Sequence, residues 1–370
     1  MAGAAVLMFS KTCSLAERRP EILKNVDAPN ESLFVEGQEV FLARSTPEAG
    51  LRPSSNATSC VSCHHVPTAG GAGELADTVV FPGRAARVEL DNLEYCGAPI
   101  FPQFAVRGTL RKPVHRQANV RAVRMPPPLY GLGLIEEIPD DAILANADPQ
   151  DSDSDGISGR PNYVDGRLGR FGVKAQVPSL FEFMFGAALN ELGLTSPFQR
   201  REVLNSCEAV QREHTPEPEL SAQEVFQLMY FVKFLAPPKA KRQTDIEQAG
   251  NQVFQHLRCS KCHIPTFRTK ASNIRAFDQV EVTLYSDLLL HDMGEVLSDG
   301  IVDGLATGRE FRTPPLWGVR DKKRFLHDGR AATIEDAIEA HGGEADHARA
   351  AFGKLDKGRR YALLAFLNSL

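Results

Sequence analysis

A five-residue motif, C-x-x-C-H, occurs twice in the 370-residue chain, at residues 60–64 and 259–263. Two thiols one helical turn apart can add to the two vinyl groups on one edge of a haem, and the next residue then lies under the iron. Zinc and redox sites also use C-x-x-C, but neither needs a histidine directly after it, twice. The motifs therefore predict two covalently bound c-type haems, attached at Cys60, Cys63, Cys259 and Cys262, with His64 and His263 as proximal iron ligands.

The sequence around the two motifs is duplicated. Residues 37–41 before the first motif read GQEVF, and residues 250–254 before the second read GNQVF. Residues 220–235 align with residues 355–370, with apolar residues at helical intervals in both stretches. A helix, the haem motif, irregular haem-covering loops and a closing helix are the plan of a class I cytochrome c. We therefore predict a mostly α-helical fold with little β-structure, made of two class I cytochrome c-like domains with long loop insertions.

The duplication also predicts the domain boundaries. We expect an N-terminal segment at residues 1–30, a first cytochrome c-like domain at 31–236, a linker at 237–243 and a second domain at 244–370. The first domain is the longer, because it carries loops rich in proline and glycine between its motif and its closing helix. Long structured loops inside a domain are usually functional, so these loops are expected to determine the chemistry at the first haem.

Charge and hydropathy exclude two classes of function. The chain has 42 Lys and Arg against 47 Asp and Glu, a net charge of −5, whereas a nucleic-acid-binding protein would carry a basic stripe. It has no run of eighteen apolar residues, so no transmembrane segment is expected.

Haem attachment also predicts where the protein matures. Covalent attachment takes place outside the cytoplasm, which predicts a periplasmic protein, although residues 1–9 lack the basic start of an export signal. Seven cysteines minus four haem bonds leave Cys13, Cys96 and Cys207. A disulfide between Cys96 and Cys207 would suit an oxidising compartment, but the sequence does not show that the two meet.

From about residue 31 to its end, the chain resembles the di-haem oxidoreductase family. This family is related to the bacterial di-haem cytochrome c peroxidases and to the di-haem enzyme that matures tryptophan tryptophylquinone. The resemblance is carried by several separate blocks in one order, at residues 59–65, 128–136, 155–160, 168–172, 287–294, 312–318, 325–331 and 341–345.

The resemblance implies a second iron ligand for the second haem. In the related peroxidases, a methionine ligand follows fourteen residues after the histidine of an F-H-S/D-G block. Here that histidine is His327, and the residue fourteen positions later is His341. We expect His263 and His341 to form a bis-histidine pair suited to electron transfer, with a lower potential than a methionine-ligated haem. The alternative is that His341 is a solvent-facing residue at a helix end; His291 and Met293 are expected to pack under this haem.

For the first haem, the resemblance implies a distal carboxylate that moves a proton across bound peroxide. Glu136 matches the family block, and Glu137 is the neighbouring candidate. The alternative is a pair of exposed carboxylates near Asp140 and Asp141. If Met125 instead capped the iron, the first haem would be an electron-transfer centre without peroxide chemistry.

Four further predictions concern the surroundings of the haems. Arg124, Arg160 and Arg170 are expected either to pair with haem propionates or to form ordinary loop ion pairs. The family often has a tryptophan where this chain has Val173, so Trp317, ten residues before His327, is either an electron relay near the haem or a buried core residue.

An acidic turn gives a candidate calcium site. Residues 151–156 read DSDSDG, the first half of an EF-hand loop, in which Asp151, Asp153 and Asp155 would supply oxygen ligands. The twelfth position is Asn162 and not glutamate, so a calcium site and a solvated acidic turn are both consistent with the pattern.

Together, these features predict a peroxidase-like di-haem oxidoreductase. It would take electrons at the second haem from a small donor, a cytochrome c or a cupredoxin, and reduce hydrogen peroxide at the first. One alternative is an enzyme that oxidises a side chain on a partner protein. The other is a non-enzymatic electron-transfer protein in which both irons are six-coordinate.

Overall fold

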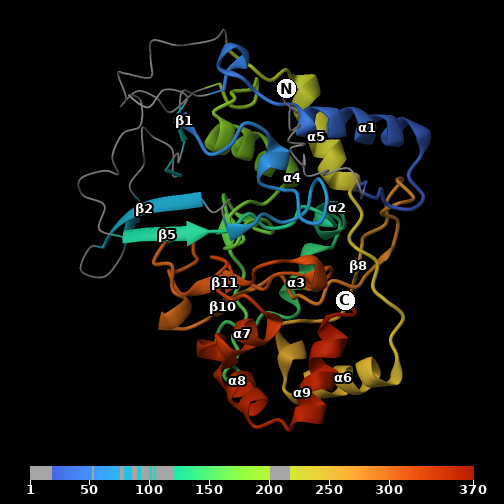
Figure 1. Cartoon of the computed structure of the whole chain (residues 1–370), viewed down its shortest axis with the longest axis vertical. Coiled ribbons are helices and arrows are strands. Elements are labelled where there is room, and N and C mark those ends of the chain that lie inside the picture. Colours follow the sequence, from blue (N-terminus) through green and yellow to red (C-terminus); the bar gives the residue numbers. More distant parts are fainter. Residues whose placement is uncertain are drawn as a thin grey trace, which may run out of the picture.

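Two crossed helix pairs, one in each half of the chain, form the frame of the fold (Figure 1). In the first half α1 (Ala28–Leu42) crosses α5 (Ala222–Phe234), and in the second α6 (Asp245–His256) crosses α9 (Lys357–Leu367). The computed structural model describes residues 19–51, 54–75, 79–85, 90–92, 100–101, 104–105, 120–200 and 217–370.

Local sequence explains where these helices begin. The side chain of Asp27 accepts a hydrogen bond from the backbone N–H of Asn30 at the start of α1. At the start of α5, Ser221 and Glu224 cap each other's backbone N–H groups. Such caps satisfy N–H groups that have no partner inside the helix, so they fix the first residue of each helix.

Short helices and small antiparallel sheets make up the other regular elements. The helices are α2 (Leu132–Glu136), α3 (Asp140–Leu144), α4 (Leu180–Ala187), α7 (Ile334–Glu339) and α8 (Asp346–Gly353). The sheets pair β1 (Ser54–Ser55) with β4 (Phe104–Ala105), β2 (Val79–Ala85) with β3 (Leu90–Asn92) and β5 (Val120–Arg124), β6 (Tyr163–Val164) with β7 (Arg167–Leu168), β8 (Phe267–Arg268) with β9 (Glu281–Val282), and β10 (Leu290–Asp292) with β11 (Glu310–Arg312). The predicted mostly helical fold with little β-structure is therefore confirmed.

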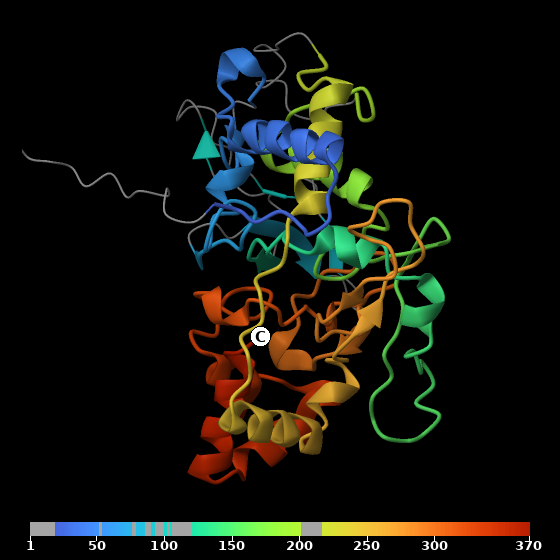
Figure 2. The same ribbon diagram turned by 90° about the vertical axis from the view of Figure 1, so that its right-hand side faces the viewer.

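The two halves are packed through a shared apolar core. Its buried residues come from both sides of the chain and include Phe41, Phe171, Phe231, Phe277, Leu289 and Trp317. A smaller core beside it belongs to the second half and includes Phe254, Phe352 and Phe366. Figure 2 shows the segment that follows α3 extending from the first half down alongside the second.

The described residues before α1 also belong to the first half. The backbone N–H of Leu23 donates to the carbonyl of Phe234, and Ile22 forms a β-bridge with Leu235. The expected boundary at residue 31 falls inside α1. The stretch expected to be a linker, residues 237–243, runs without helix or strand from α5 to α6, and the N–H of Lys241 donates to the carbonyl of Ser369.

Candidate haem-binding sites

Each C-x-x-C-H motif lies beside its crossed helix pair in the same way. In both motifs a short 3-10 turn runs from the first cysteine to the second. It starts at Cys60 in the first half and at Cys259 in the second. The ring of Phe41 is 6.5 Å from that of His64, at an angle of 52°. The ring of Phe254 is 6.4 Å from that of His263, at 54°. The duplicated sequence therefore produces duplicated geometry around the two expected proximal ligands.

A glycine lets each helix pair cross closely. A Cβ at Gly37 would overlap the carbonyl oxygen of Gln227 and lie 2.9 Å from the Cβ of Phe231. A Cβ at Gly250 would overlap the carbonyl oxygen of Ala362 and lie 2.7 Å from the Cβ of Phe366. In the alignment of residues 220–235 with residues 355–370, Gln227 pairs with Ala362 and Phe231 pairs with Phe366, so the two glycines contact equivalent positions.

The three histidines expected to bind iron share one hydrogen-bonding pattern. In each, the ring Nδ1 donates to a backbone carbonyl: His64 to Gly71 at 3.3 Å, His263 to Tyr285 at 2.9 Å, and His341 to Ala337 at 2.6 Å. Burial lowers the pKa of His64 and of His263 to about 4, and it also lowers the pKa of His341. Each ring is therefore neutral at neutral pH, which is the form of imidazole that binds a metal.

The second motif opens onto a cavity of about 280 Å³. Cys259, Cys262, His263 and His341 all line it, together with apolar side chains that include Phe254, Leu316, Phe325, Ile338 and Leu363. Two thiols, two imidazoles and an apolar lining are the groups that a covalently attached, bis-histidine haem requires. The residues of this cavity therefore fit the expected cofactor, and the geometry disfavours the alternative of a solvent-facing His341.

The thiols themselves are unsuited to disulfide exchange. Burial raises the pKa of Cys60 to about 11 and that of Cys259 to about 12. A redox-active C-x-x-C depends on a thiol whose pKa is lowered, because the thiolate is the attacking species. Half-buried cysteines next to an expected histidine ligand agree instead with thioether attachment.

Two cationic residues that line the cavity are not among the haem-binding residues predicted from the sequence. They are Arg312, at the end of β11, and Lys322. Arg312 belongs to one of the blocks shared with the family, but nothing in the sequence shows that its guanidinium faces the cavity. Its Nη1 is buried and has no hydrogen-bond partner among the described residues.

Residues 106–370 match the model of the protein family described as "Di-haem oxidoreductase, putative peroxidase". This match covers well over half of the sequence. The chain belongs to the di-haem oxidoreductase family. No protein of curated function has a significantly similar sequence.

Similar solved structures share little sequence with this di-haem oxidoreductase. One is hydrazine synthase of Kuenenia stuttgartiensis, at 14% identity and a TM-score of 0.43, with all of both chains covered. A MauG-like protein associated with microbial copper homeostasis is 16% identical, with a TM-score of 0.44 over 99% of this chain and 95% of that one. The diheme peroxidase BthA of Burkholderia thailandensis E264 is also 16% identical, with a TM-score of 0.46 over 95% of this chain and 86% of that one.

In this di-haem oxidoreductase both candidate acid–base carboxylates contact Lys233 of α5. The ammonium is 2.9 Å from Glu137 and 3.3 Å from Glu136. Glu137 is also 3.2 Å from Lys270; these lysines outweigh the effect of burial and hold the pKa of Glu137 below its usual value. Glu136 has one weaker lysine contact, and its other oxygen accepts the N–H of Leu180 at the start of α4.

The three arginines are held by groups of the protein itself. Arg124 donates to Asp299 and Asp303, each at 2.9 Å. Arg160 binds Glu310 through two nitrogens, and Arg170 contacts Asp140 and the carbonyl of Ile135. These contacts agree with ion pairing rather than with propionate binding.

Trp317, His327 and Met125 lie where the two halves meet. Trp317 is buried in the shared core, with its ring against Gly131, whose φ of +76° and lack of Cβ make room for the indole. His327 stacks on Phe311 at 4.1 Å and lines the cavity of the second motif. Met125 lines the same cavity and lies against Gly329.

His291 lies in a buried cluster beside the second motif. Its Nε2 is 2.8 Å from Asp287, its Nδ1 is 2.6 Å from Glu344, and the sulfur of Cys262 is 3.5 Å away. Burial alone would lower the pKa of His291, but its contacts with Cys262 and with the carboxylate of Asp287 raise it well above its usual value. Glu344 also accepts from the N–H and hydroxyl of Ser158, so the cluster joins the two halves.

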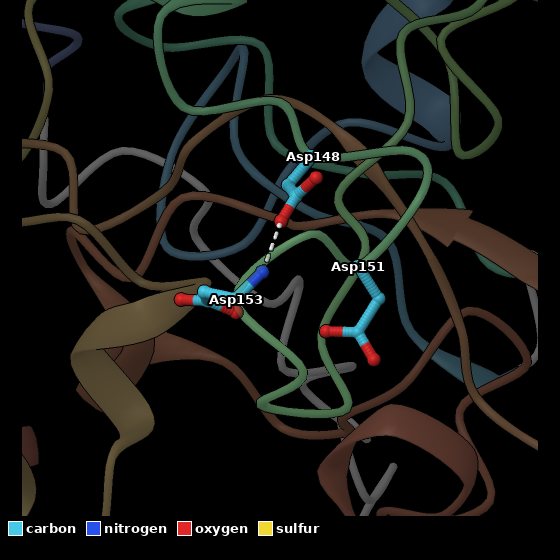
Figure 3. Close-up of side chains that lie close together, drawn as sticks. All are labelled: Asp148, Asp151 and Asp153. Carbon is cyan, nitrogen blue, oxygen red and sulfur yellow. Dashed lines mark hydrogen bonds between the residues drawn. The ribbon is translucent and has the colours of Figure 1, made fainter.

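The acidic turn differs from the predicted calcium loop. The carboxylates that lie together are those of Asp148, Asp151 and Asp153 (Figure 3). Asp155 is instead ion-paired with Arg258 and Lys261, which flank the cysteine that starts the second motif. Backbone N–H groups donate to Asp148 and Asp151, and calcium binding at this turn stays a prediction.

One prediction concerns residues that the structure does not describe, and another concerns membrane-spanning helices. Cys13, Cys96 and Cys207 lie outside the described residues, so the disulfide stays a prediction. Among the described helices, none has both the length and the apolar character needed to cross a membrane.

Proposed function

We propose that the protein is a periplasmic c-type di-haem oxidoreductase that reduces hydrogen peroxide with electrons from a small cytochrome c or cupredoxin. The observation that carries the proposal is the second cavity, where His263 and His341 share one apolar lining with Cys259 and Cys262. Membership of the di-haem oxidoreductase family supports the reaction class.

The side chains divide into an electron-transfer half and a reactive half. When bound, the haem of the second half would supply electron transfer and the haem of the first half would supply the reaction with peroxide. His263 and His341 would hold the haem of the second half, with each ring oriented by its carbonyl partner. His64 would hold the haem of the first half, with its ring oriented by the carbonyl of Gly71.

Peroxide reduction needs a carboxyl group that gives and takes a proton. We assign this role to Glu136. Glu137 is fixed by two lysines and its lowered pKa keeps it ionised. Glu136 has one lysine contact, the longer one with Lys233, and accepts the N–H of Leu180. With one cation beside it instead of two, it is our candidate for the group that exchanges a proton.

Haem content and coordination give the first test. A pyridine haemochrome assay on the purified protein should find two covalent haems, and the variants Cys60→Ala/Cys63→Ala and Cys259→Ala/Cys262→Ala should each lose one. Electron paramagnetic resonance of the oxidised and half-reduced protein should show a high-spin haem beside a low-spin one. Two low-spin haems in every redox state would overturn the peroxidase proposal.

Peroxide turnover with a reduced small cytochrome gives the second test. Glu136→Gln removes the proton carrier and should slow turnover by about 10²–10⁴-fold, the usual contribution of general acid–base catalysis. Glu137→Gln is the matched control, because the neighbouring carboxylate binds the same lysine, and it should retain most of the activity. Equal losses in both variants would argue against the assignment of Glu136.

A non-enzymatic electron carrier is the second candidate. The observation in its favour is the ion pair between Lys233 and Glu136, which gives this carboxylate a structural role as well. A carrier would exchange electrons with the donor but would show no peroxide turnover in the same assay.

A further inference from the structure

Two cations, the buried Arg312 and the half-buried Lys322, line the cavity of the second motif without an anionic partner among the described residues. Arg312 is 9% exposed, and its Nε donates to the carbonyl of Gly172 at 2.9 Å. Its Nη1 has no partner among the described residues. The ammonium of Lys322 forms no hydrogen bond or ion pair with any described side chain, and both residues line the cavity.

The two charges also repel each other. Burial, followed by the charge of Arg312, lowers the pKa of Lys322 to about 8. Burial lowers the pKa of Arg312 to about 10, although Asp287 opposes this shift. Asp287 does not neutralise the arginine, because its carboxylate is hydrogen-bonded to His291 and to the N–H of Leu289. Two unpaired cations in an apolar cavity are strongly unfavourable, so the arrangement points to an anion that binds there.

Other basic residues around this cavity are already neutralised. Arg258 is paired with Asp155, and Arg349 is paired with Asp346 and half exposed. Farther away, the three arginines predicted from the sequence as candidate partners of haem propionates are each paired with a carboxylate: Arg124 with Asp303, Arg160 with Glu310 and Arg170 with Asp140. Arg312 and Lys322 are therefore the cations of this cavity that remain available to an anionic ligand.

We propose that Arg312 and Lys322 bind the two propionates of the haem attached at Cys259 and Cys262. The inference rests on the proposed function for the presence of that haem. The guanidinium of Arg312 can donate two parallel hydrogen bonds to one propionate, and the ammonium of Lys322 can supply a compact positive charge for the other propionate. The side chain of Arg312 donates to the carbonyl of Gly172, and its backbone N–H donates to the carbonyl of Val173. The contact between Arg312 and a propionate would therefore join the second haem to a loop of the first half.

Loss of either cation should change the redox behaviour of the second haem without releasing it. A nearby positive charge disfavours the more positive, oxidised iron, so its removal should lower the midpoint potential. A propionate without its cation should also have a higher pKa, because its ionised form loses a partner. The pH dependence of the potential should therefore shift towards higher pH.

The experiment uses the holoprotein and the variants Arg312→Met, Arg312→Lys and Lys322→Met. Spectroelectrochemical titration of the low-spin haem across a pH series gives its potential, and resonance Raman spectra give its propionate bending modes. Arg349→Met is the matched control, because it removes the same charge from the rim of the same cavity. We expect a lower potential and shifted propionate bands in Arg312→Met and Lys322→Met, with a smaller change in Arg312→Lys.

The outcomes separate this inference from the proposed function. If Arg312→Met and Lys322→Met shift the potential no more than Arg349→Met and leave the propionate bands unchanged, the inference is overturned while the haem assignment stands. If the haemochrome assay finds no haem at the second motif, both are overturned. If Arg312→Met does not fold, Lys322→Met and Arg312→Lys give the same decision.

Discussion

A partly buried ion pair between Arg160 and Glu310 links the two halves of the molecule. Glu310 binds Arg160 through both carboxylate oxygens, at 2.8 and 2.6 Å, and it also accepts the N–H of Thr307. Burial would raise the pKa of Glu310, but these bonds keep it below the ordinary value. The pair therefore adds stability that is complete above the unfolded-state pKa of glutamate and is lost as the pH falls through the lower, folded-state value.

Glu310→Gln should lower the free energy of unfolding at pH 7 by about 2 kcal/mol, the loss of hydrogen bonds to a charged group. The difference from wild type should shrink at acidic pH, because Glu310 is then protonated in both states. Denaturant unfolding over a pH series measures both effects. Glu21→Gln is the control: its pair with Lys239 is exposed on both sides, so the change should stay within about 0.5 kcal/mol. A deficit that persisted undiminished at acidic pH would contradict this account.

At the scale of elements, the helix crossings depend on glycine. A Cβ at Gly250 would overlap the backbone of α9, and one at Gly37 would overlap the backbone of α5. Gly250→Ala should therefore lower the free energy of unfolding by about 2 kcal/mol, because the helices would have to move apart. Gly186→Ala is the matched control, since nothing lies within 4 Å of the added methyl group in α4. That variant should gain up to about 1 kcal/mol from helix propensity.

These elements also show what the sequence can predict. The crossed helices follow from local signals, a repeated glycine–phenylalanine spacing and apolar residues at helical intervals. His341 could be named as a candidate ligand because a family spacing points to it. Arg312 and Lys322 could not be named as candidates for binding an anion, because a missing partner is a property of the folded surroundings, which residues far apart in sequence create. Ser158 and Glu344, 186 positions apart, likewise have no local pattern that would reveal their contact.

At the scale of the whole molecule, one core crosses the boundary between the halves. Trp317 from the second half packs on Gly131 from the first, and both halves contribute buried residues to the same cluster. The ion pair of Arg160 with Glu310 and the bonds of Ser158 to Glu344 span the same boundary. Separating the halves would expose this apolar surface and break these bonds, so we expect both halves to unfold in a single transition.

The chain contains one tryptophan, and it lies at this boundary. Its fluorescence should therefore report separation of the halves, while far-ultraviolet circular dichroism reports the helices of both. In a denaturant titration the two signals should change with one midpoint. Trp317→Phe is the control, because it removes the fluorescence change and should leave a cooperative dichroism transition. A fluorescence midpoint at clearly lower denaturant than the dichroism midpoint would mean that the halves part while their crossed helices are still folded.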